Sequence, residues 1–542
     1  MPAIVPLPGL NARIFSPGLD NPPPVCFYMQ KHRPNHFMTQ GKPMLLETFP
    51  SREEFRSLLA ASTVVPVGAR ILADTETPVS VLARFAPRSP HLFLLESAEG
   101  GERWGRFSFM GVSARATVAV YRNDVVIRQG IDEKRIPHNG DPLSVLRDLM
   151  KPYSLAHLPG LPRLCGGLVG YFSYEMIHFF EPRVPNKLPP ERPMAEFVIP
   201  DTLLIFDNVN HTLTALALAF KEDGEPDALF DAAHARVKDL LDTLATPVPA
   251  GSPTGKTPIR TPAPIHPPED FKAMVAKVKD HVYEGDIIQC VVSQSFVGPA
   301  PDDLVSLYRA QRHVNPSPYL FFLKAQHCTL IGSSPETMIR LDHRTATLRP
   351  IAGTRPRGAT EQEDRKLADS LLQDDKERAE HLMLVDLGRN ELGRVALPGT
   401  VQVTDLMIVE RYSHVMHLVS NITADLEPGH DAFDLFASSF PAGTLSGAPK
   451  IRAMEIIADL EKEPRGPYGG AVGYVSFDGN MDFCICIRTA VAEHGRLTIR
   501  AGAGIVADSD PETELKETQN KAAAMARALQ LLQTAQQAES KT

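Results

Sequence analysis

The chain has 542 residues, of which 43% are hydrophobic and 22% are charged, as in ordinary globular proteins. This length exceeds what a single hydrophobic core usually serves, which predicts two domains or one large composite domain. The net charge of -9 argues against nucleic-acid and anionic-membrane partners, and no apolar run approaches the roughly 20 residues that a membrane helix needs.

The first half of the chain begins with an unusual segment. Residues 1–43 are rich in proline and nearly free of acids, which predicts a disordered extension or a mis-assigned start. Residues 44–242 form an N-terminal portion, with a helix expected in SREEFRSLLA at Ser51. Strands are expected in HLFLLES at His91 and in GGLVGYFSYE at Gly166.

Proline density then marks a boundary. Residues 243–268 contain too many prolines for a helix interior or a central strand, which predicts a linker or a long loop. Residues 269–530 follow as the expected catalytic domain, and residues 531–542 as a C-terminal tail. Within that domain GGAVGYVSFD at Gly469 echoes the earlier GGLVGYFSYE, which suggests that both portions contribute strands to a shared sheet system.

Two long helices are expected in the second half. The stretch from Thr360 to Leu387 lacks glycine and proline, which predicts one helix. Another helix is predicted to start at Pro511, with Asp510 as its cap. Strands surround both without a regular βαβ alternation, which favours an α+β fold. The scattered cysteines form no CxxC pair, which indicates reduced thiols in a cytoplasmic protein.

Two Glu-x-x-Glu pairs lie on these helices. Glu377 and Glu380 share one helix face, and Glu514 and Glu517 repeat the spacing. Together the pairs would form an acidic pocket for a cation that prefers oxygen ligands. The alternative is that each pair is a solvated helix surface, with Glu517 bonded to Lys521.

Four motifs occur in a fixed order: PIAGTRPRG from Pro350, DKERAEHLMLVDLGRNELGR from Asp375, GTLSGAPKIRAM from Gly443 and AGAGIVADSDPETELKETQNKA from Ala501. Together they resemble the chorismate-binding core of the chorismate-utilising enzymes. The resemblance implies an α+β fold of two antiparallel sheets packed face to face with helices outside. It also implies a Mg²⁺ site at Glu380 and Glu517 that holds the ring carboxylate of chorismate.

The resemblance implies further site residues. Arg488 supplies a bidentate fork for the second carboxylate of chorismate, and Tyr468 supplies a hydroxyl. The glycines let backbone N–H groups approach the substrate. The implied substrate contacts are Gly353, Thr354, Tyr468, Arg488, Gly502, Ala503 and Gly504. The implied catalytic residues are Glu377 as the acid for the leaving hydroxyl, His417 for the elimination, and Glu336, Glu514 and Gln289.

Two positions discriminate within the family. Aminodeoxychorismate synthases commonly carry a nucleophilic lysine where this chain has Ala352. Isochorismate and salicylate synthases use a lysine to activate water where this chain has Gln289. The combination resembles the large subunits of anthranilate synthases. We therefore expect chorismate and ammonia to be converted to anthranilate and pyruvate, the first committed step of L-tryptophan synthesis.

The family resemblance also implies partners. No glycine-flanked cysteine elbow precedes a suitable His and Glu, so a separate glutaminase subunit is expected, in a heterotetramer of two large and two small subunits. LLES and NPSPYLFF resemble two sides of an L-tryptophan inhibitor site, in which Leu320 replaces a frequent methionine. The expected inhibitor-binding residues are Glu96, Ser97, Pro318, Tyr319 and Leu320. Alternatives are the two sister enzyme types and a tryptophan sensor without catalysis.

Overall fold

The computed structural model describes residues 44–97, 105–249, 259–412 and 415–539. All of them fall in one compact unit, Gly41–Thr542. The extension predicted for residues 1–43 lies outside the described part of the chain.

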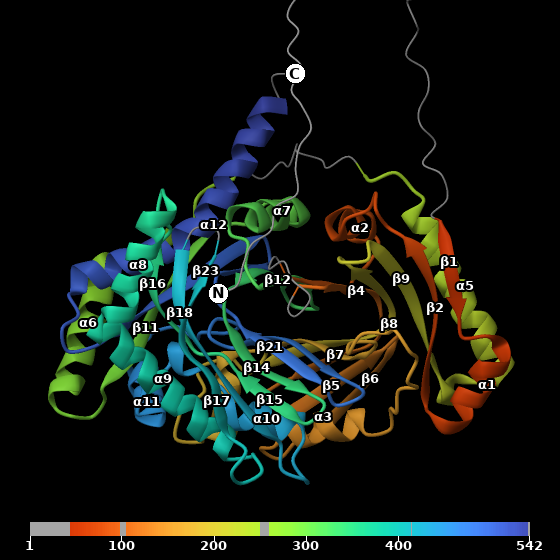
Figure 1. The fold of residues 1–542 in the computed structure, drawn as a ribbon, viewed down its shortest axis with the longest axis horizontal. Coiled ribbons are helices and arrows are strands. Elements are labelled where there is room, and N and C mark those ends of the chain that lie inside the picture. The colour runs from red at the N-terminus through yellow and green to blue at the C-terminus, as the bar shows by residue number, and fades with distance from the viewer. Residues whose placement is uncertain (1–43, 98–104, 250–258, 413–414, 540–542) are drawn as a thin grey trace, which may run out of the picture. The chain divides into compact units, whose positions relative to one another are not determined.

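The strands in the described residues form one hydrogen-bonded network of 23 strands, and the pairs of neighbouring strands are antiparallel (Figure 1). In chain order they are β1 (Leu45–Phe49), β2 (Val64–Leu72), β3 (Leu92–Glu96), β4 (Phe107–Val120), β5 (Asp124–Gln129), β6 (Asp132–Pro137), β7 (Gly167–Phe172), β8 (Ala195–Asp207), β9 (Thr212–Phe220), β10 (Ala263–Pro264), β11 (Gln289–Pro299), β12 (Tyr319–Lys324), β13 (Thr329–Ser334), β14 (Thr337–Asp342), β15 (Thr345–Leu348), β16 (Ile351–Pro356), β17 (Gln402–Arg411), β18 (Val415–Asp425), β19 (Gly447–Ala448), β20 (Ala471–Ser476), β21 (Met481–Ile485), β22 (Thr489–Glu493) and β23 (Arg496–Ile505).

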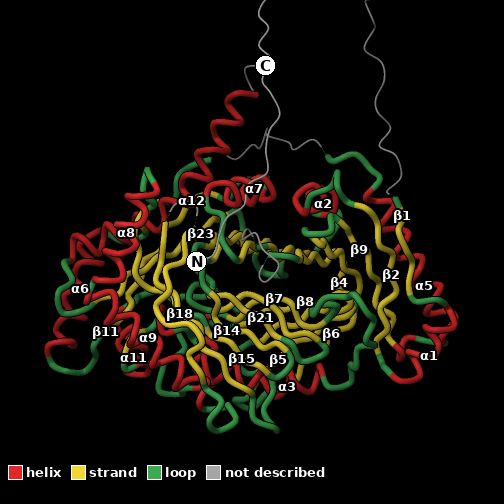
Figure 2. Tube along the Cα trace, viewed as in Figure 1, coloured by secondary structure: helices red, strands yellow, loops and turns green. Residues whose placement is uncertain are grey.

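Helices flank this network on its outer sides, as Figure 2 shows in red. They are α1 (Arg52–Ala61), α2 (Pro78–Phe85), α3 (Pro142–Met150), α4 (Ile177–Phe180), α5 (Pro226–Leu244), α6 (Pro268–Tyr283), α7 (Leu304–Val314), α8 (Glu361–Gln373), α9 (Asp375–Gly393), α10 (Ala432–Ser439), α11 (Lys450–Leu460) and α12 (Pro511–Glu539). Among the described residues, no helix combines the length and the apolar character that crossing a membrane requires.

The network bends into two layers that pack against each other. One buried cluster joins Phe93 and Phe321 of the first layer to Tyr171 and Val472 of the second. Two further clusters bury the outer faces against helices, one under α1, α2, α5, α7 and α12 and the other under α3, α9 and α10. The predicted α+β fold with two antiparallel sheets face to face and helices outside is confirmed.

The two layers are continuous rather than separate sheets, because β4 and β8 run through both. In β8, Phe197 packs in the cluster of the second layer, whereas Phe206 packs in that of the first. The pairing of β4 with β8 shifts register between Gly111 and Ala116. Such irregularities let long strands bend from one layer into the next.

The two similar segments GGLVGYFSYE and GGAVGYVSFD form strands that pair with each other. β7 and β20 are antiparallel neighbours, with Gly170 opposite Gly473. A Cβ on Gly170 would lie 1.9 Å from the carbonyl oxygen of Glu196, and one on Gly473 would lie 2.0 Å from that of Asp482. The repeated glycine is therefore needed for close strand contact, and the prediction of a shared sheet system is confirmed.

One predicted helix is two helices. The stretch from Thr360 to Leu387 breaks at Asp374, which separates α8 from α9. The Asp374 side chain accepts hydrogen bonds from the backbone N–H groups of Lys376 and Glu377, at 3.1 Å each. An aspartate in a helix favours this N-cap geometry, so a new helix starts without any glycine or proline.

The last helix begins as predicted. α12 starts at Pro511, and the backbone N–H of Thr513 donates to the Asp510 carboxylate at 2.9 Å. The helix continues to Glu539, so it enters the segment predicted as a tail. Within the predicted linker, β10 pairs with β11. The four division points drawn from the sequence stay predictions.

Candidate active site

One wall of the candidate site is formed by α9, β11 and β23. The Gln289 side-chain amide, at the start of β11, donates to Glu380 Oε1 of α9 at 3.0 Å. A Cβ on Gly504 of β23 would lie 2.7 Å from Gln289 Nε2. Any side chain at position 504 would therefore displace the amide that holds Glu380.

The alternation of β23 explains the glycine-alanine-glycine segment. Ala503 points into the cluster between β11, α6 and α11, where it is fully buried. Gly502 and Gly504 face the opposite side, and a Cβ on Gly502 would lie 2.7 Å from the Tyr468 hydroxyl. Only the backbone of Ala503 can contribute to a binding surface, whereas the two glycines open that surface.

A second wall is formed by β16 and β18, in which Thr354 pairs with His417. His417 Nδ1 lies 3.0 Å from the carbonyl oxygen of Gly353 and 3.1 Å from Thr354 Oγ1. The carbonyl can only accept, so Nδ1 carries the proton of the neutral ring and Nε2 keeps a lone pair. Burial lowers the pKa of His417, with a further lowering by the Arg488 charge that the Gly353 carbonyl opposes.

Glu377 lies at the start of α9 beside β16. Its Oε1 accepts from Arg355 at 3.3 Å, and Arg355 also bonds Asp374 at 2.7 Å. Burial raises the pKa of Glu377, the Arg355 guanidinium opposes that rise, and the Glu380 charge adds to it. A carboxyl with a raised pKa is suited to donating a proton near neutral pH.

Arg488 lies between β21 and β22 in the left-handed backbone region, with φ +51°. Burial lowers the pKa of its guanidinium, while Tyr468 and Glu517 act to raise it. Among the residues that the structure describes, this guanidinium donates no hydrogen bond. A partly buried cation with unused donors is a ready partner for an incoming carboxylate.

The second candidate metal ligand has an internal partner. Glu517 Oε1 of α12 lies 2.7 Å from Lys521 Nζ, as the alternative interpretation of that helix predicts. Lys521 Nζ also donates to the carbonyl oxygen of Gly502 at 3.0 Å. Burial raises the pKa of Glu514 one turn earlier, and the Glu517 charge adds to that effect.

The donor set fits a hard cation. Glu380 reaches β11 through Gln289, and Glu517 reaches the neighbouring β23 through Lys521. Each bond occupies one oxygen, so carboxylate oxygens remain for a metal that prefers oxygen ligands. These two glutamates are the residues that would hold it.

Glu336 is a buried acid between β13 and β14. Its Oε1 accepts from Thr444 Oγ1 at 3.0 Å. Burial raises the pKa of Glu336 to about 8, so the side chain is protonated at neutral pH and can donate. Sequence reasoning did not single out Thr444 or Arg355, although both lie inside motifs that carry the family resemblance.

The two candidate inhibitor motifs are paired strands. β3 and β12 are antiparallel, with Glu96 opposite Leu320. The Glu96 carboxylate accepts from Tyr308 of α7 and lies 3.4 Å from Arg312 of the same helix. Burial raises the pKa of Glu96, and the Arg312 charge opposes that rise.

The other predicted inhibitor residues flank this pair. Tyr319 donates its hydroxyl to Asp482 at 2.9 Å, and Leu320 is 1% exposed in the first-layer cluster. Ser97 and Pro318 stand at the adjoining strand ends. The structure brings both motifs together, but the side chains of Tyr319 and Leu320 are already engaged in the fold.

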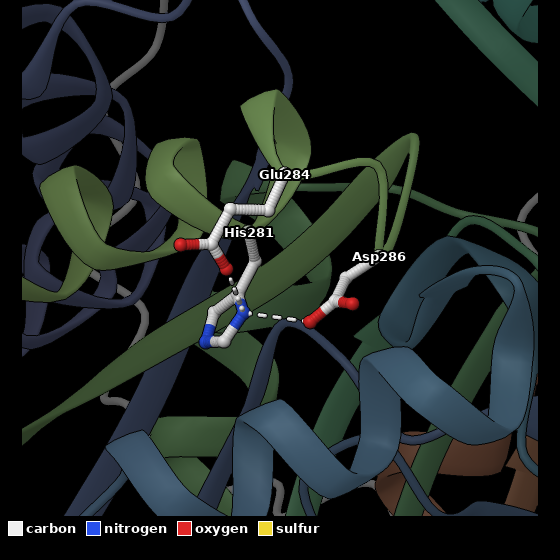
Figure 3. Close-up of side chains that lie close together, drawn as sticks. All are labelled: His281, Glu284 and Asp286. Atoms are coloured by element: carbon white, nitrogen blue, oxygen red, sulfur yellow. Dashed lines mark hydrogen bonds and ion pairs between the residues drawn. The ribbon is translucent and has the colours of Figure 1, made fainter.

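A different cluster meets a geometric criterion for metal ligands. In the described chain, one group of three candidate side chains has ligand atoms all within 4.8 Å of one another: His281, Glu284 and Asp286 (Figure 3). His281 Nδ1 lies 2.9 Å from Asp286 Oδ2, which Arg452 also contacts at 2.6 Å. An ion-pair network at the end of α6 accounts for this cluster without a metal.

The sequence matches the family model of chorismate-binding enzymes over residues 91–527. The chain therefore belongs to the chorismate-binding enzyme family, and the prediction that it is an enzyme of this family is confirmed.

Within the family the similarity is to one branch. Anthranilate synthase component 1 of Pseudomonas putida is 44% identical over 492 residues, which cover 89% of this chain and 98% of that protein. The component 1 protein of Aquifex aeolicus is 42% identical over 495 residues, covering 90% of this chain and 99% of its own. These similarities confirm the resemblance to anthranilate synthase large subunits.

Solved structures agree with this placement. The crystal structure of anthranilate synthase component I from Streptococcus pneumoniae superposes with a TM-score of 0.70 at 34% identity, covering 79% of this chain and 93% of that one. The menaquinone-specific isochorismate synthase MenF from Escherichia coli gives a TM-score of 0.63 at 19% identity, over 88% and 98%. The latter shows a common fold only.

Proposed function

We propose that this chain is the aminating subunit of an anthranilate synthase, which converts chorismate and ammonia to anthranilate and pyruvate. The observation that carries the proposal is the partly buried Arg488 guanidinium, whose donors are unused among the described residues. It lies within electrostatic reach of Glu517 and of Tyr468. A substrate with two carboxylates fits a site that offers one partly buried cation and one acidic pair of the kind that binds a hard cation.

Arg488 binds the enolpyruvyl carboxylate, and Glu380 and Glu517 are the residues that would hold Mg²⁺ for the ring carboxylate. The bound cation supplies positive charge that offsets the repulsion between an anionic substrate and an acidic pocket. Gly502 and Gly504 let Tyr468 and Gln289 keep their positions, because a side chain at either glycine would meet one of them.

The proton chemistry requires an acid, because hydroxide is a poor leaving group. Ammonia adds at C2 of the ring while the C4 hydroxyl leaves as water, and elimination of pyruvate then gives the aromatic product. Glu377 and Glu336 have raised pKa values and are the candidate donors. His417, neutral and with a free Nε2, is suited to receiving a proton in the elimination.

Ammonia rather than water is the proposed nucleophile. Gln289 is a neutral amide bonded to Glu380, so it cannot act as a base for water. Ala352 excludes a covalent lysine intermediate of the aminodeoxychorismate type. We further propose that a separate glutaminase subunit supplies the ammonia in a heterotetramer, and that L-tryptophan inhibits by binding near Glu96, Ser97 and Pro318.

The test uses the purified chain with chorismate, Mg²⁺ and an ammonium salt, and follows anthranilate fluorescence. The expected result is metal-dependent anthranilate from ammonium, and none from glutamine until a glutaminase subunit is added. Isochorismate, salicylate or a 4-amino product would contradict the proposal and assign a sister reaction. Tryptophan binding without chorismate turnover would favour a sensor instead.

A further inference from the structure

Helix α7 lies between the candidate inhibitor site and the candidate substrate site. Tyr308 and Arg312 of α7 both contact the Glu96 carboxylate. Gln311, one turn after Tyr308 on the same side of the helix, donates its side-chain amide to the main-chain carbonyl of Arg488 at 3.4 Å. Figure 1 shows α7 beside α12, against which it packs. One short helix therefore touches both sites.

Gln311 has a buried amide that lowers the stability of the fold, which is unusual for a residue with only a packing role. Its side chain is 1% exposed, and its Oε1 is buried with no hydrogen-bond partner in the described part of the chain. A buried amide that leaves its oxygen unsatisfied destabilises a fold relative to an apolar side chain of the same size. A function other than packing explains why an amide is present there.

The carbonyl that Gln311 contacts belongs to a strained residue. Arg488 is held at φ +51°, which a non-glycine residue adopts only when its surroundings impose it. Its carbonyl also accepts from the Ser333 backbone N–H at 3.3 Å. Ser333 is bonded in turn by Asn315, whose own N–H caps α7 by donating to the Gln311 carbonyl at 2.9 Å. Both hydrogen bonds that the described residues donate to the Arg488 main-chain carbonyl thus lead back to the end of α7.

We propose that Gln311 is a positioning residue that holds Arg488 in its substrate-binding conformation, and that α7 couples this hold to occupancy of the Glu96 site. The inference rests on the proposed function, because it takes Arg488 as the carboxylate anchor and Glu96 as part of the inhibitor site. An inhibitor that competes for Glu96 changes the bonds of Tyr308 and Arg312. The resulting shift of α7 withdraws Gln311 from Arg488 and weakens chorismate binding.

The test is the variant Gln311→Met, which keeps the volume but removes the donor. We expect the KM for chorismate to rise at least about fivefold with kcat changed less than about twofold, since only positioning of a binding group is lost. The coupling is measured by calorimetry without ammonia, as the ratio of the chorismate Kd values with and without saturating L-tryptophan. Typical coupling is about 5- to 150-fold, and the variant should bring the ratio close to one while still binding L-tryptophan.

The matched control is Arg309→Met, the same replacement at an exposed position of α7. It should keep the native KM and the native ratio. A second variant, Gln311→Asn, keeps the amide but shortens its reach, and should change KM and the ratio in the same direction by less. It also covers the case in which the methionine variant fails to fold.

Three results overturn the inference. Native KM and native coupling in Gln311→Met, even with a lower Tm, would leave Gln311 a structural residue. Loss of L-tryptophan binding in that variant would place Gln311 in the formation of the inhibitor site rather than in its coupling. A changed ratio in Arg309→Met would make the effect nonspecific. Failure of the proposed function is distinct, because the unaltered chain would then form no anthranilate from chorismate and ammonium.

Discussion

The two candidate ligand sites differ in how much of their hydrogen-bonding capacity the fold has already used. At the candidate inhibitor site, the Glu96 carboxylate is bonded by Tyr308 and faces Arg312, and Tyr319 is bonded to Asp482. At the candidate active site, the Arg488 guanidinium donates to none of the described residues. The polar groups of the candidate inhibitor site are already bonded within the protein, whereas Arg488 in the candidate active site has donors left for a ligand.

This difference has a physical consequence. A ligand at the Glu96 site must exchange existing bonds for new ones, so its binding moves the groups that it displaces. A ligand at Arg488 adds bonds to a group that is already in place, so its binding needs little rearrangement. The first behaviour suits a regulatory site and the second suits a catalytic site.

Glu517→Gln tests most directly whether Glu380 and Glu517 form a metal site. If Glu517 is a metal ligand, turnover should fall by more than about 100-fold, since even residues that only support a ligand cost about 10- to 100-fold. Steady-state rates across a Mg²⁺ titration measure the effect. The control is Glu512→Gln in the first turn of the same helix, where the carboxylate contacts Lys272. Equal losses in both variants, or full activity in Glu517→Gln, would contradict the metal assignment.

The cationic side is broken by Arg488→Ala. Removing one partner of a buried charged pair costs about 3–5 kcal/mol. Because Arg488 is partly accessible to solvent, we expect about 2–4 kcal/mol, or about 30- to 700-fold in kcat/KM. Arg488→Lys keeps the positive charge but not the two-pronged guanidinium, so its kcat/KM should lie between those of the unaltered chain and of Arg488→Ala. Unchanged kinetics in the alanine variant would remove Arg488 from the substrate site.

The contact between Gln289 and Gly504 can be disturbed by Gly504→Ala. The new Cβ would lie 2.7 Å from Gln289 Nε2, so Gln289 must shift and Glu380 loses its donor. A shift of about 1 Å in a group of the catalytic site costs about 10- to 100-fold in kcat/KM. Gly393→Ala, where no atom lies within 4 Å, is the control and should be close to native. Native kinetics in Gly504→Ala would contradict the role given to this wall.

The buried acid of the active site predicts a pH dependence. Glu336, with a pKa of about 8, donates only while protonated, so kcat should decline as pH rises through about 8. One pH unit above the pKa, about a tenth of the molecules retain the proton. Glu336→Gln keeps a polar partner for Thr444 but cannot titrate, so it should lower kcat and flatten the alkaline limb. A native limb in that variant would assign the titration to another group.

The satisfied site is perturbed by Ser97→Phe, for which we expect the smallest effect on turnover. An aromatic ring next to Glu96 should block L-tryptophan and raise its half-inhibitory concentration about tenfold or more, a loss of about 1.4 kcal/mol or more. Rates at saturating chorismate should change less than about twofold. Inhibition equal to that of the unaltered chain would remove Ser97 from the inhibitor site.

The sequence predicts the elements of this fold better than their junctions. Alternation and helical periodicity identify strands such as β3 and β7 and helices such as α1 and α12, because those patterns reflect one buried face. The break between α8 and α9 at Asp374 is not predicted from the sequence, because the aspartate caps a new helix without glycine or proline. The bend of β4 and β8 is also not predicted, because it depends on which strands pair with and pack against each half of a long strand.

The site shows the same division. The motifs and the family resemblance that they carry point to Glu380, His417 and Arg488, although of these three only Glu380 lies inside one of the four motifs. The partners that set their behaviour come from distant segments, as Gln311 of α7 does for the carbonyl of Arg488. The raised pKa of Glu336 is likewise a product of burial, which only the folded chain defines.

If Glu380, Glu517 and Arg488 form one chorismate site that depends on a cation, chorismate binding must require both the metal and these residues. The decisive measurement is calorimetric titration of chorismate into the chain without ammonia, in Mg²⁺ and then in EDTA. We expect binding in Mg²⁺ that is abolished by EDTA and by Glu380→Gln, and weakened at least about 30-fold by Arg488→Ala. Equal binding in Mg²⁺ and EDTA, unaffected by both substitutions, would contradict this requirement.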